Sequence, residues 1–284
     1  MNERTLVSAE WLAEKLGSPL LRLFDCRFEL SSPGYGRESY AEEHIPTAVF
    51  ADLERDLSAP RTSSSGRHPL PAPDRFAAKL RNWGVSEDSQ VVVYDDSAGM
   101  YAARLWWMLR WLGHERVAVL DGGLRRWRQL DLPLQELAER PRPGNFMARQ
   151  RPAMLAHIDE VASVATDNSL RLLDARAPER FRGEMETLDP IAGHVPGARN
   201  HPFMNSVDDD ARFLPVERLR YMLDASLDGA TSERTITMCG SGVTACHLLL
   251  AMEHADLPDA KLYVGSWSEW SRSPDRPIAT GRDP

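Results

Sequence analysis

Cysteine is scarce in this sequence, which has only Cys26, Cys239 and Cys246 among its 284 residues. Three widely spaced cysteines do not make the paired framework of a disulfide-stabilised secreted domain. They also lack the paired C-x-x-C spacing of a structural zinc site. The sequence therefore predicts a reducing, cytoplasmic setting, without a disulfide framework and without a bound metal.

The sequence also contains few lysines and no long apolar run. The chain has 34 basic residues, only three of them lysines, against 42 acidic ones, and its formal net charge is -8. This balance argues against a general binder of nucleic acid or of anionic membranes. No apolar run approaches the about 18 residues that cross a bilayer, and the polar start lacks the hydrophobic segment of a signal peptide. We expect a soluble protein that binds neither nucleic acid nor membranes.

An internal repeat is what the sequence does contain. The stretch "LRLFDCRFEL" at 21–30 matches "LRLLDARAPE" at 170–179, and "VLDGGLRRW" at 119–127 matches "LYVGSWSEW" at 262–270. Two further matches lie between them, and all four offsets fall between 143 and 150 residues. Four landmarks in the same order at a nearly constant offset indicate a tandem duplication.

Short apolar runs alternate with helical patterns in both halves. The runs predict buried strands at 20–24, 91–94, 117–120, 171–173, 235–238 and 261–264. Helical periodicity lies between them, at 73–83, 102–112, 158–165, 216–223 and 242–254. This alternation predicts an α/β fold with parallel sheets covered on both faces. We place the N-terminal domain at 1–135, a stiff proline-rich linker at 136–153 and the C-terminal domain at 154–284.

One strand-to-helix junction carries the candidate reactive group. The loop "CGSGVT" at 239–244 follows a predicted strand and precedes a helix, where open parallel sheets bind ligands. Gly240 and Gly242 allow a tight turn whose amide N–H groups point inward, and such amides at a helix start stabilise an anion. We therefore interpret Cys239 as a reactive thiolate. Cys246, which aliphatic residues follow, is predicted to be a core residue.

Other roles of Cys239 compete with that of a nucleophile. Zinc binding needs four ligands, and the nearby Cys246, His247 and His254 lack a paired motif. Cysteine phosphatases carry a phosphate-clamping arginine six positions after the thiolate, where this chain has Ala245. A redox-sensing binding protein remains an alternative, because exposed thiolates oxidise readily.

These motifs resemble those of tandem rhodanese-domain sulfurtransferases over essentially the whole chain. The form "CGSGVTA" is typical of 3-mercaptopyruvate sulfurtransferases, whereas thiosulfate sulfurtransferases usually carry two basic residues after the cysteine; "GHVPGA", "DGGLRRW" and "GSWSEW" are further family marks. The resemblance implies two rhodanese-like domains, each a parallel β-sheet flanked by helices. Asp95 stands where the second half has Cys239, which implies an inactive N-terminal domain and a catalytic C-terminal one.

The resemblance also implies a reaction. A sulfane sulfur would pass from 3-mercaptopyruvate, through a persulfide on Cys239, to a thiol such as thioredoxin or to cyanide, in two covalent steps. Thiosulfate is the alternative donor, although the neutral Gly240–Ser241 pair offers a dianion little positive charge. No metal and no cofactor are implied. We expect a monomer whose partners are the small anionic donor and the acceptor.

The site residues follow by the same similarity. Catalysis is assigned to Cys239, with a proton relay of Ser241, His68 and Glu54. Donor binding is assigned to Arg180, Arg182, Tyr101, Gly240, Gly242, Val243 and Thr244. Arg176 is expected instead to pair with an acidic group and fix the fold. Mercaptopyruvate enzymes usually carry a second arginine in a "PEPR"-like stretch, whereas "GEMETLDPIAGH" at 183–194 contains none.

Overall fold

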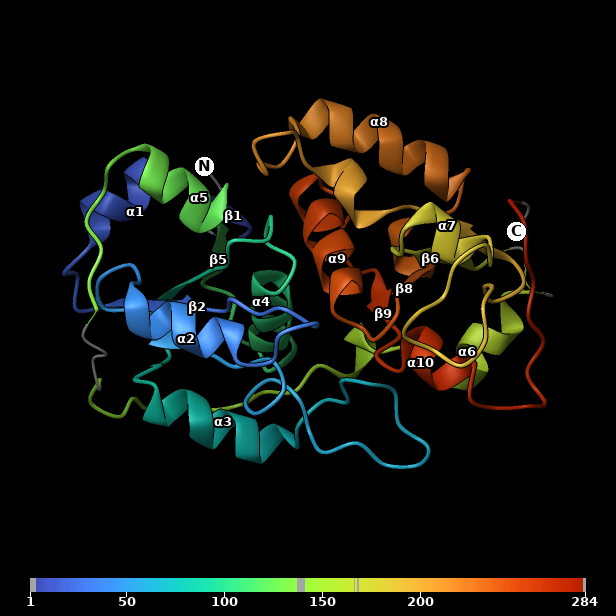
Figure 1. Cartoon of the computed structure of the whole chain (residues 1–284), viewed down its shortest axis with the longest axis horizontal. Coiled ribbons are helices and arrows are strands. Elements are labelled where there is room, and N and C mark those ends of the chain that lie inside the picture. The colour runs from blue at the N-terminus through green and yellow to red at the C-terminus, as the bar shows by residue number, and fades with distance from the viewer. Residues whose placement is uncertain (1–3, 137–140, 166, 168, 283–284) are drawn as a thin grey trace. The chain divides into compact units, whose positions relative to one another are not determined.

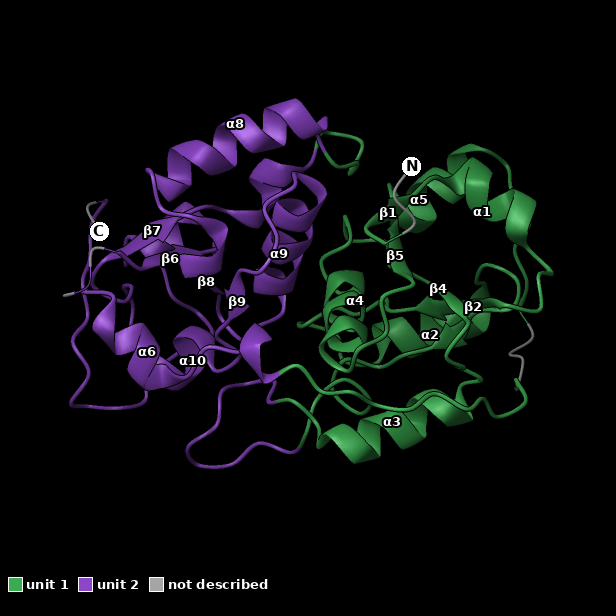
Figure 2. Cartoon of the chain, turned by 180° about the vertical axis from the view of Figure 1, so that it is seen from behind, with its two compact units in different colours: residues 1–59, 70–151, 208–213 green, residues 60–69, 152–207, 214–284 purple. Residues whose placement is uncertain are grey.

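Two compact units make up the chain, and Figure 2 distinguishes them by colour. The computed structural model describes residues 4–136, 141–165, 167 and 169–282; residues 137–140 of the linker predicted at 136–153 lie outside the described residues. Unit 1 consists of Met1–Ala59, Leu70–Arg151 and Asp208–Phe213, and unit 2 of Pro60–Pro69, Pro152–Val207 and Leu214–Pro284. His68, which comes from the first half of the repeat, therefore belongs to unit 2.

Unit 1 is built around a parallel sheet in the order β1-β5-β4-β2-β3. Its strands are β1 (Leu6–Val7), β2 (Leu21–Asp25), β3 (Val49–Phe50), β4 (Gln90–Tyr94) and β5 (Val117–Leu120). Its helices are α1 (Ala9–Lys15), α2 (Tyr35–Glu42), α3 (Pro73–Asn82), α4 (Ala102–Trp111) and α5 (Gly123–Gln129), shown in Figure 1. Strand β4 is buried along its whole length, because helices cover both faces of such a sheet. The core includes Val7, Leu12, Leu23, Val92, Leu124 and Trp127.

Unit 2 repeats this plan with a smaller parallel sheet in the order β7-β6-β8-β9. Its strands are β6 (Arg171–Asp174), β7 (Ala198–Asn200), β8 (Thr235–Met238) and β9 (Lys261–Leu262). Its α-helices are α6 (Ile158–Ser163), α7 (Pro178–Phe181), α8 (Val216–Leu227), α9 (Thr244–His254) and α10 (Ser266–Trp270), and its short 3-10 helices are η1 (Pro152–Met154), η2 (Phe203–Ser206) and η3 (Ser232–Arg234). The core includes Val161, Leu172, Phe181, Ile236, Met238, Trp267 and Trp270.

The predicted fold class is confirmed, with local differences at the ends of elements. Strands β1, β3 and β7 were not predicted, because two or three residues are too few to form a recognisable apolar run. The helix expected from 242 begins at Thr244, since Gly242 has a φ of 75° and belongs to the loop. The strand expected at 261–264 ends at Leu262.

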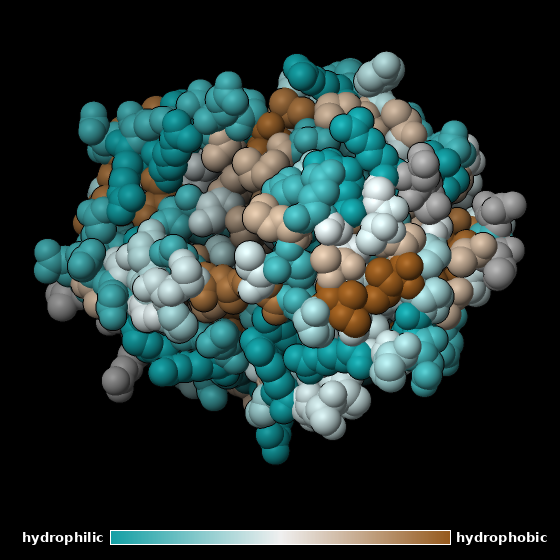
Figure 3. Space-filling view, turned by 45° about the vertical axis from the view of Figure 1, so that its right-hand side comes forward, coloured by the Kyte–Doolittle hydropathy of each residue, from teal (hydrophilic) through white to brown (hydrophobic). Residues whose placement is uncertain are grey.

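The described surface is mainly hydrophilic on the face that Figure 3 shows, with hydrophobic groups exposed between the polar ones. The large exposed hydrophobic residues of the described chain are Leu20, Leu30, Met147, Met185, Leu188, Ile191, Met204 and Tyr221. No helix in the described part of the chain is long and apolar enough to cross a membrane.

A buried ion pair ends the same strand in both units. The Asp174 carboxylate accepts bonds from Arg176 Nε at 2.9 Å and Nη2 at 2.6 Å, and from the Arg176 backbone N–H at 3.0 Å. Asp25 and Arg27 in unit 1 make the same three contacts at the same distances. All four side chains are at most 1% exposed. The prediction that Arg176 pairs with an acidic group is confirmed.

Removing one charge of this pair is expected to destabilise the protein. Asp174→Asn removes the nearer counter-ion of the buried Arg176 guanidinium and leaves it with Glu186 at 3.7 Å, which costs about 3–5 kcal/mol of the free energy of unfolding. Urea denaturation measures the change. The control is Arg220→Ala, which removes an exposed pair with Asp224 on α8 and should cost about 0.5 kcal/mol or less. Equal effects of the two changes would refute a structural role for the buried pair.

His201 provides a pH-dependent contribution to stability. Burial lowers the pKa of its ring to about 4, and its Nδ1 lies 2.7 Å from Ser226 Oγ. In the unfolded chain histidine titrates near about 6.5, so the unfolded state takes up the proton first as the pH falls. The free energy of unfolding should therefore decrease from pH 6.5 down to about pH 4, by at most roughly 1.4 kcal/mol per pH unit from this group. Denaturation curves at several pH values should show a shallower decrease for His201→Gln; parallel curves would contradict the assignment.

Candidate active site

The loop between β8 and α9 is held from behind by the start of α10. The Cys239 backbone N–H donates to Ser266 Oγ at 3.1 Å, and the Trp267 N–H donates to the Cys239 carbonyl at 3.0 Å. The Ser268 N–H donates to the Gly240 carbonyl at 2.9 Å. Ser266 adopts a φ of 53°, a left-handed conformation that non-glycine residues rarely occupy. The "GSWSEW" segment thus fixes the backbone on which Cys239 is carried.

Two glycines shape the space around the Cys239 sulfur. The Gly242 N–H donates to Cys239 Sγ at 3.1 Å, and a Cβ at Gly242 would lie 2.6 Å from the Val264 carbonyl oxygen. Only glycine fits that turn, because its φ is also 75°. The loop continues through Val243 to Thr244, the first residue of α9. Cys239 is 2% exposed and therefore lies in a largely desolvated position.

The corresponding loop of unit 1 holds a carboxylate. Asp95 follows β4 as Cys239 follows β8. The last residue of β4 is in register with Asp25, and the last residue of β8 is in register with Asp174. The Asp95 carboxylate accepts four backbone N–H bonds of 2.8–2.9 Å, from Ser97, Gly99, Tyr101 and Ala102. This loop therefore satisfies a buried carboxyl group with backbone N–H donors, while burial raises its pKa. The anion site predicted at the cysteine loop stays a prediction.

The segment Pro60–Pro69 brings a histidine to the cysteine loop within unit 2. His68 Nδ1 lies 2.8 Å from Ser241 Oγ, and both residues are buried. A Cβ at Gly66 would lie 2.5 Å from the Gly265 carbonyl oxygen, so this close approach of two backbones depends on glycine. The structure joins two members of the predicted relay, and the His68 side chain is buried at the loop.

Two predicted residues belong to unit 1. Glu54 is exposed there, and its backbone N–H donates to Asp52 Oδ1 at 3.0 Å. Tyr101 packs edge-on against the Phe28 ring, and burial raises the pKa of its phenol to about 12. Their predicted roles in catalysis and donor binding stay predictions.

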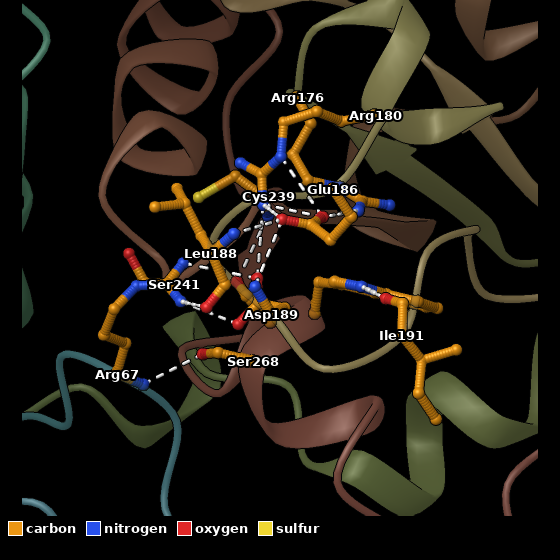
Figure 4. Close-up of polar contacts among 12 residues, drawn as sticks. Arg67, Arg176, Arg180, Glu186, Leu188, Asp189, Ile191, Cys239, Ser241 and Ser268 are labelled. Carbon is orange, nitrogen blue, oxygen red and sulfur yellow. Dashed lines mark hydrogen bonds and ion pairs between the residues drawn. The ribbon is translucent and has the colours of Figure 1, made fainter. Parts of the chain in front are cut away.

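A cluster of arginines and carboxylates lies beside the loop, and Figure 4 shows its contacts. Arg180 Nη2 contacts Glu186 Oε1 at 2.7 Å and Asp189 Oδ2 at 3.2 Å. Arg67 Nη1 contacts Asp189 Oδ1 at 2.6 Å. A Cβ at Gly240 would lie 3.1 Å from Arg67 Nη2 and 3.3 Å from Arg180 Nη1, so both guanidinium groups border the residue next to the nucleophile.

Three members of this cluster were not identified from the sequence. Arg67 stands beside His68 in "GRHPLP", and Glu186 and Asp189 occupy the stretch where the family's second arginine is usually found. The position of Arg67 next to His68 was the one feature of the sequence that could have pointed to Arg67. Arg182, in contrast, lies in a separate pair with the exposed Glu184, with Nη2 and Oε2 2.6 Å apart.

Glu186 is held as an anion. Burial acts to raise the pKa of its carboxyl group, but contacts from Arg180 and the backbone N–H groups of Leu188 and Asp189 act in the opposite direction. The net result is a pKa below the ordinary value for glutamate. Its negative charge therefore remains in place beside Arg180 at neutral pH.

The other two cysteines have structural surroundings. All three thiols are free, and Cys246 is fully buried with Sγ 3.3 Å from the Gly242 carbonyl oxygen, which confirms its prediction as a core residue. Burial raises the pKa of the Cys26 thiol well above its ordinary value. Within the described residues, no three or more His, Cys, Asp and Glu side chains are grouped to hold a metal ion. The candidate site thus combines a thiol that accepts a backbone N–H, a hydroxyl–imidazole pair and two guanidinium groups.

Comparisons with known proteins identify the family of the chain. The rhodanese-like domain family matches the chain at residues 8–130 and again at 157–273. A probable 3-mercaptopyruvate sulfurtransferase from Pseudomonas aeruginosa is 48% identical over 283 residues, which cover 99% of this chain and 100% of that protein. The thiosulfate sulfurtransferase of Rattus norvegicus is 36% identical, over 98% of this chain and 96% of its own.

A solved structure shares the fold. The crystal structure of SseA from Escherichia coli, a 3-mercaptopyruvate sulfurtransferase, matches with a TM-score of 0.80 and 37% identity. The match covers 93% of this chain and 99% of SseA. Both kinds of sulfur donor are thus represented in the names of the chain's relatives.

Proposed function

Because the chain belongs to the family of rhodanese-like domain proteins, we propose that it is a sulfurtransferase that takes sulfur from 3-mercaptopyruvate onto Cys239. The observation that carries this proposal is the environment of the Cys239 sulfur. It accepts the Gly242 N–H at the start of a helix, and two guanidinium groups border the adjacent Gly240. A cysteine that accepts a backbone N–H beside two guanidinium groups is suited to attack a small anionic sulfur donor.

The reaction divides into two covalent steps. The Cys239 thiolate attacks the donor sulfur, and the carbon–sulfur bond breaks with its electron pair passing to the carbon. The products are a persulfide on Cys239 and the enolate of pyruvate, which takes up a proton to become pyruvate. An acceptor thiolate or cyanide then attacks the outer sulfur and regenerates the Cys239 thiolate. Splitting the transfer in this way predicts ping-pong kinetics.

The Ser241–His68 pair supports the proton transfer in the first step. With 2.8 Å between His68 Nδ1 and Ser241 Oγ, a proton can pass between the ring and the hydroxyl. Histidine suits this role because it exchanges protons near neutral pH. The proposal retains Glu54 as the acidic member of the relay and Tyr101 as a donor contact, on the family resemblance.

Mercaptopyruvate is favoured over thiosulfate by the charge around the loop. Gly240 and Ser241 are neutral, and the arginines beside them already hold carboxylates. A thiosulfate dianion would gain more from uncompensated positive charge than this loop supplies. We propose a thiol such as thioredoxin, or cyanide, as the acceptor, and a cytoplasmic monomer as the working form.

Replacing Cys239 tests the nucleophile. Cys239→Ser should lower turnover by at least about 10³-fold and abolish the gain of one sulfur atom in the protein mass after donor treatment. Cys246→Ser is the matched control and should keep both, because that thiol lies in the core. A mass gain that persists in Cys239→Ser would place the persulfide elsewhere.

The donor assignment is tested with the wild-type protein. We expect a higher kcat/KM for 3-mercaptopyruvate than for thiosulfate, with cyanide as the common acceptor. The opposite order would overturn the choice of donor and favour the activity named for the rat relative. A redox sensor would be favoured instead if the wild-type protein turned over neither donor and Cys239→Ser lost the response to oxidant.

Replacing His68 tests the relay. His68→Ala should lower kcat for mercaptopyruvate by about 10²- to 10⁴-fold, the usual contribution of a general acid–base group, and change the pH–rate profile. The exposed His157 gives the control variant His157→Ala, which should leave both unaltered. Unchanged turnover of His68→Ala would reject the relay while leaving the nucleophile in place.

A further inference from the structure

Two arginines far apart in the sequence share one carboxylate in unit 2. Arg67 lies in the segment Pro60–Pro69 and Arg180 in helix α7. Asp189 Oδ1 lies 2.6 Å from Arg67 Nη1, and its Oδ2 lies 3.2 Å from Arg180 Nη2. The carboxylate thus bridges two guanidinium groups, which is how paired arginines bind a small carboxylic acid.

The two guanidinium groups also border the residue that follows Cys239. Both guanidinium groups lie within 3.3 Å of the place where a Cβ of Gly240 would stand, and Gly240 follows Cys239 directly. A side chain at Gly240 would meet these groups, so its absence leaves them access to the loop. A carboxylate held there would place a short donor molecule next to the Cys239 sulfur (Figure 4).

The charges of the cluster balance before any donor enters. Its three guanidinium groups and three carboxylates belong to Arg67, Arg176 and Arg180, and to Asp174, Glu186 and Asp189. The side chains of Arg67, Arg180 and Asp189 are only 10%, 18% and 3% exposed. A fourth carboxylate would leave an uncompensated negative charge in a poorly solvated place, which is costly. An entering carboxylate is accommodated more readily if it replaces one already there.

Asp189 is the carboxylate best placed to leave. Asp174 ends strand β6 and pairs with Arg176, and Glu186 contacts Arg180 through both oxygens and also accepts the N–H groups of Leu188 and Asp189. Asp189 lies, like Glu186, in a segment that forms neither helix nor strand, and its carboxylate contacts the two arginines. This segment runs between Gly183 and Gly193, which have φ values of 78° and 125°. Its side chains Met185, Leu188 and Ile191 are 42–48% exposed and so pack little, while side-chain donors hold the carbonyls of Leu188, Ile191 and Gly193.

We propose that Arg67 is a specificity-determining residue that binds the donor carboxylate together with Arg180, at the position the Asp189 carboxylate occupies in this structure. The inference rests on the proposed function, since it takes the donor to be a 2-oxo carboxylate. Arg67 supplies from another part of the chain the second cation that residues 183–194 lack. Asp189 exchanges with the donor carboxylate and moves outward as the donor binds.

Binding without reaction gives the direct test. In the Cys239→Ser background, calorimetric titration with 3-mercaptopyruvate measures Kd in the absence of sulfur transfer. Adding Arg67→Gln should raise this Kd by roughly 10- to 100-fold, because a charge-assisted contact to the carboxylate is lost. Arg67→Lys should recover part of the affinity, since it keeps the charge without the planar fork. The control Arg220→Gln removes an exposed arginine of α8 and should leave Kd unchanged.

The Asp189→Asn variant separates exchange from a structural role. If Asp189 competes with the donor, this variant should lower the Kd and the KM for mercaptopyruvate by about two- to tenfold. If Asp189 only holds Arg67 in place, Kd should stay unchanged or rise, and the exchange is refuted. Thermal unfolding of each variant monitors its fold.

Failure of the inference can be told from failure of the proposed function. Wild-type protein that transfers no sulfur from mercaptopyruvate contradicts the function, whatever Arg67 does. Wild-type protein that transfers sulfur, combined with an unchanged Kd in Arg67→Gln, overturns the inference alone.

Discussion

The buried pair of Asp174 and Arg176 is the interaction on which the candidate site depends. Arg176 Nη2 donates to the Gly193 carbonyl at 2.8 Å, its Nη1 lies 3.7 Å from Glu186 Oε2, and its guanidinium group covers the Trp267 ring at 4.7 Å. The buried Arg176 guanidinium group therefore connects the end of β6, the segment that carries Glu186 and the start of α10. Because α10 in turn holds the backbone of Cys239, the position of the nucleophile follows from this pair.

The loops that follow the corresponding strands of the two units hold different groups. After the corresponding strand, unit 1 places the Asp95 carboxylate among four N–H groups, and unit 2 places the Cys239 sulfur against the Gly242 N–H. A carboxylate in such a cradle is a stable cap for α4 that has no need to react. The two loops also differ in length, since α4 begins seven residues after Asp95 and α9 five residues after Cys239. Under the proposed function the shorter loop carries the reactive thiol.

Much of the fold was predictable because it depends on local patterns. Apolar runs marked β2, β4, β5, β6 and β8, whose burial on both faces demands continuous hydrophobic residues. Strands of two or three residues carry too little pattern, so β1, β3 and β7 emerge only from their pairing with longer neighbours. The role of the 60–69 segment was partly visible, since "GRHPLP" drew attention to His68 but not to the arginine beside it.

The sequence by itself determined the duplication and the α/β class, and it singled out Cys239 as the candidate reactive group, since each rests on residues that are neighbours in the chain. Only the tertiary structure decided which arginines face the loop. Arg67 and Arg180 are separated by more than a hundred residues and meet at Asp189 because the chain returns Pro60–Pro69 to unit 2. Charge pairing across such distances follows from the packing of whole elements, and no local spacing records it.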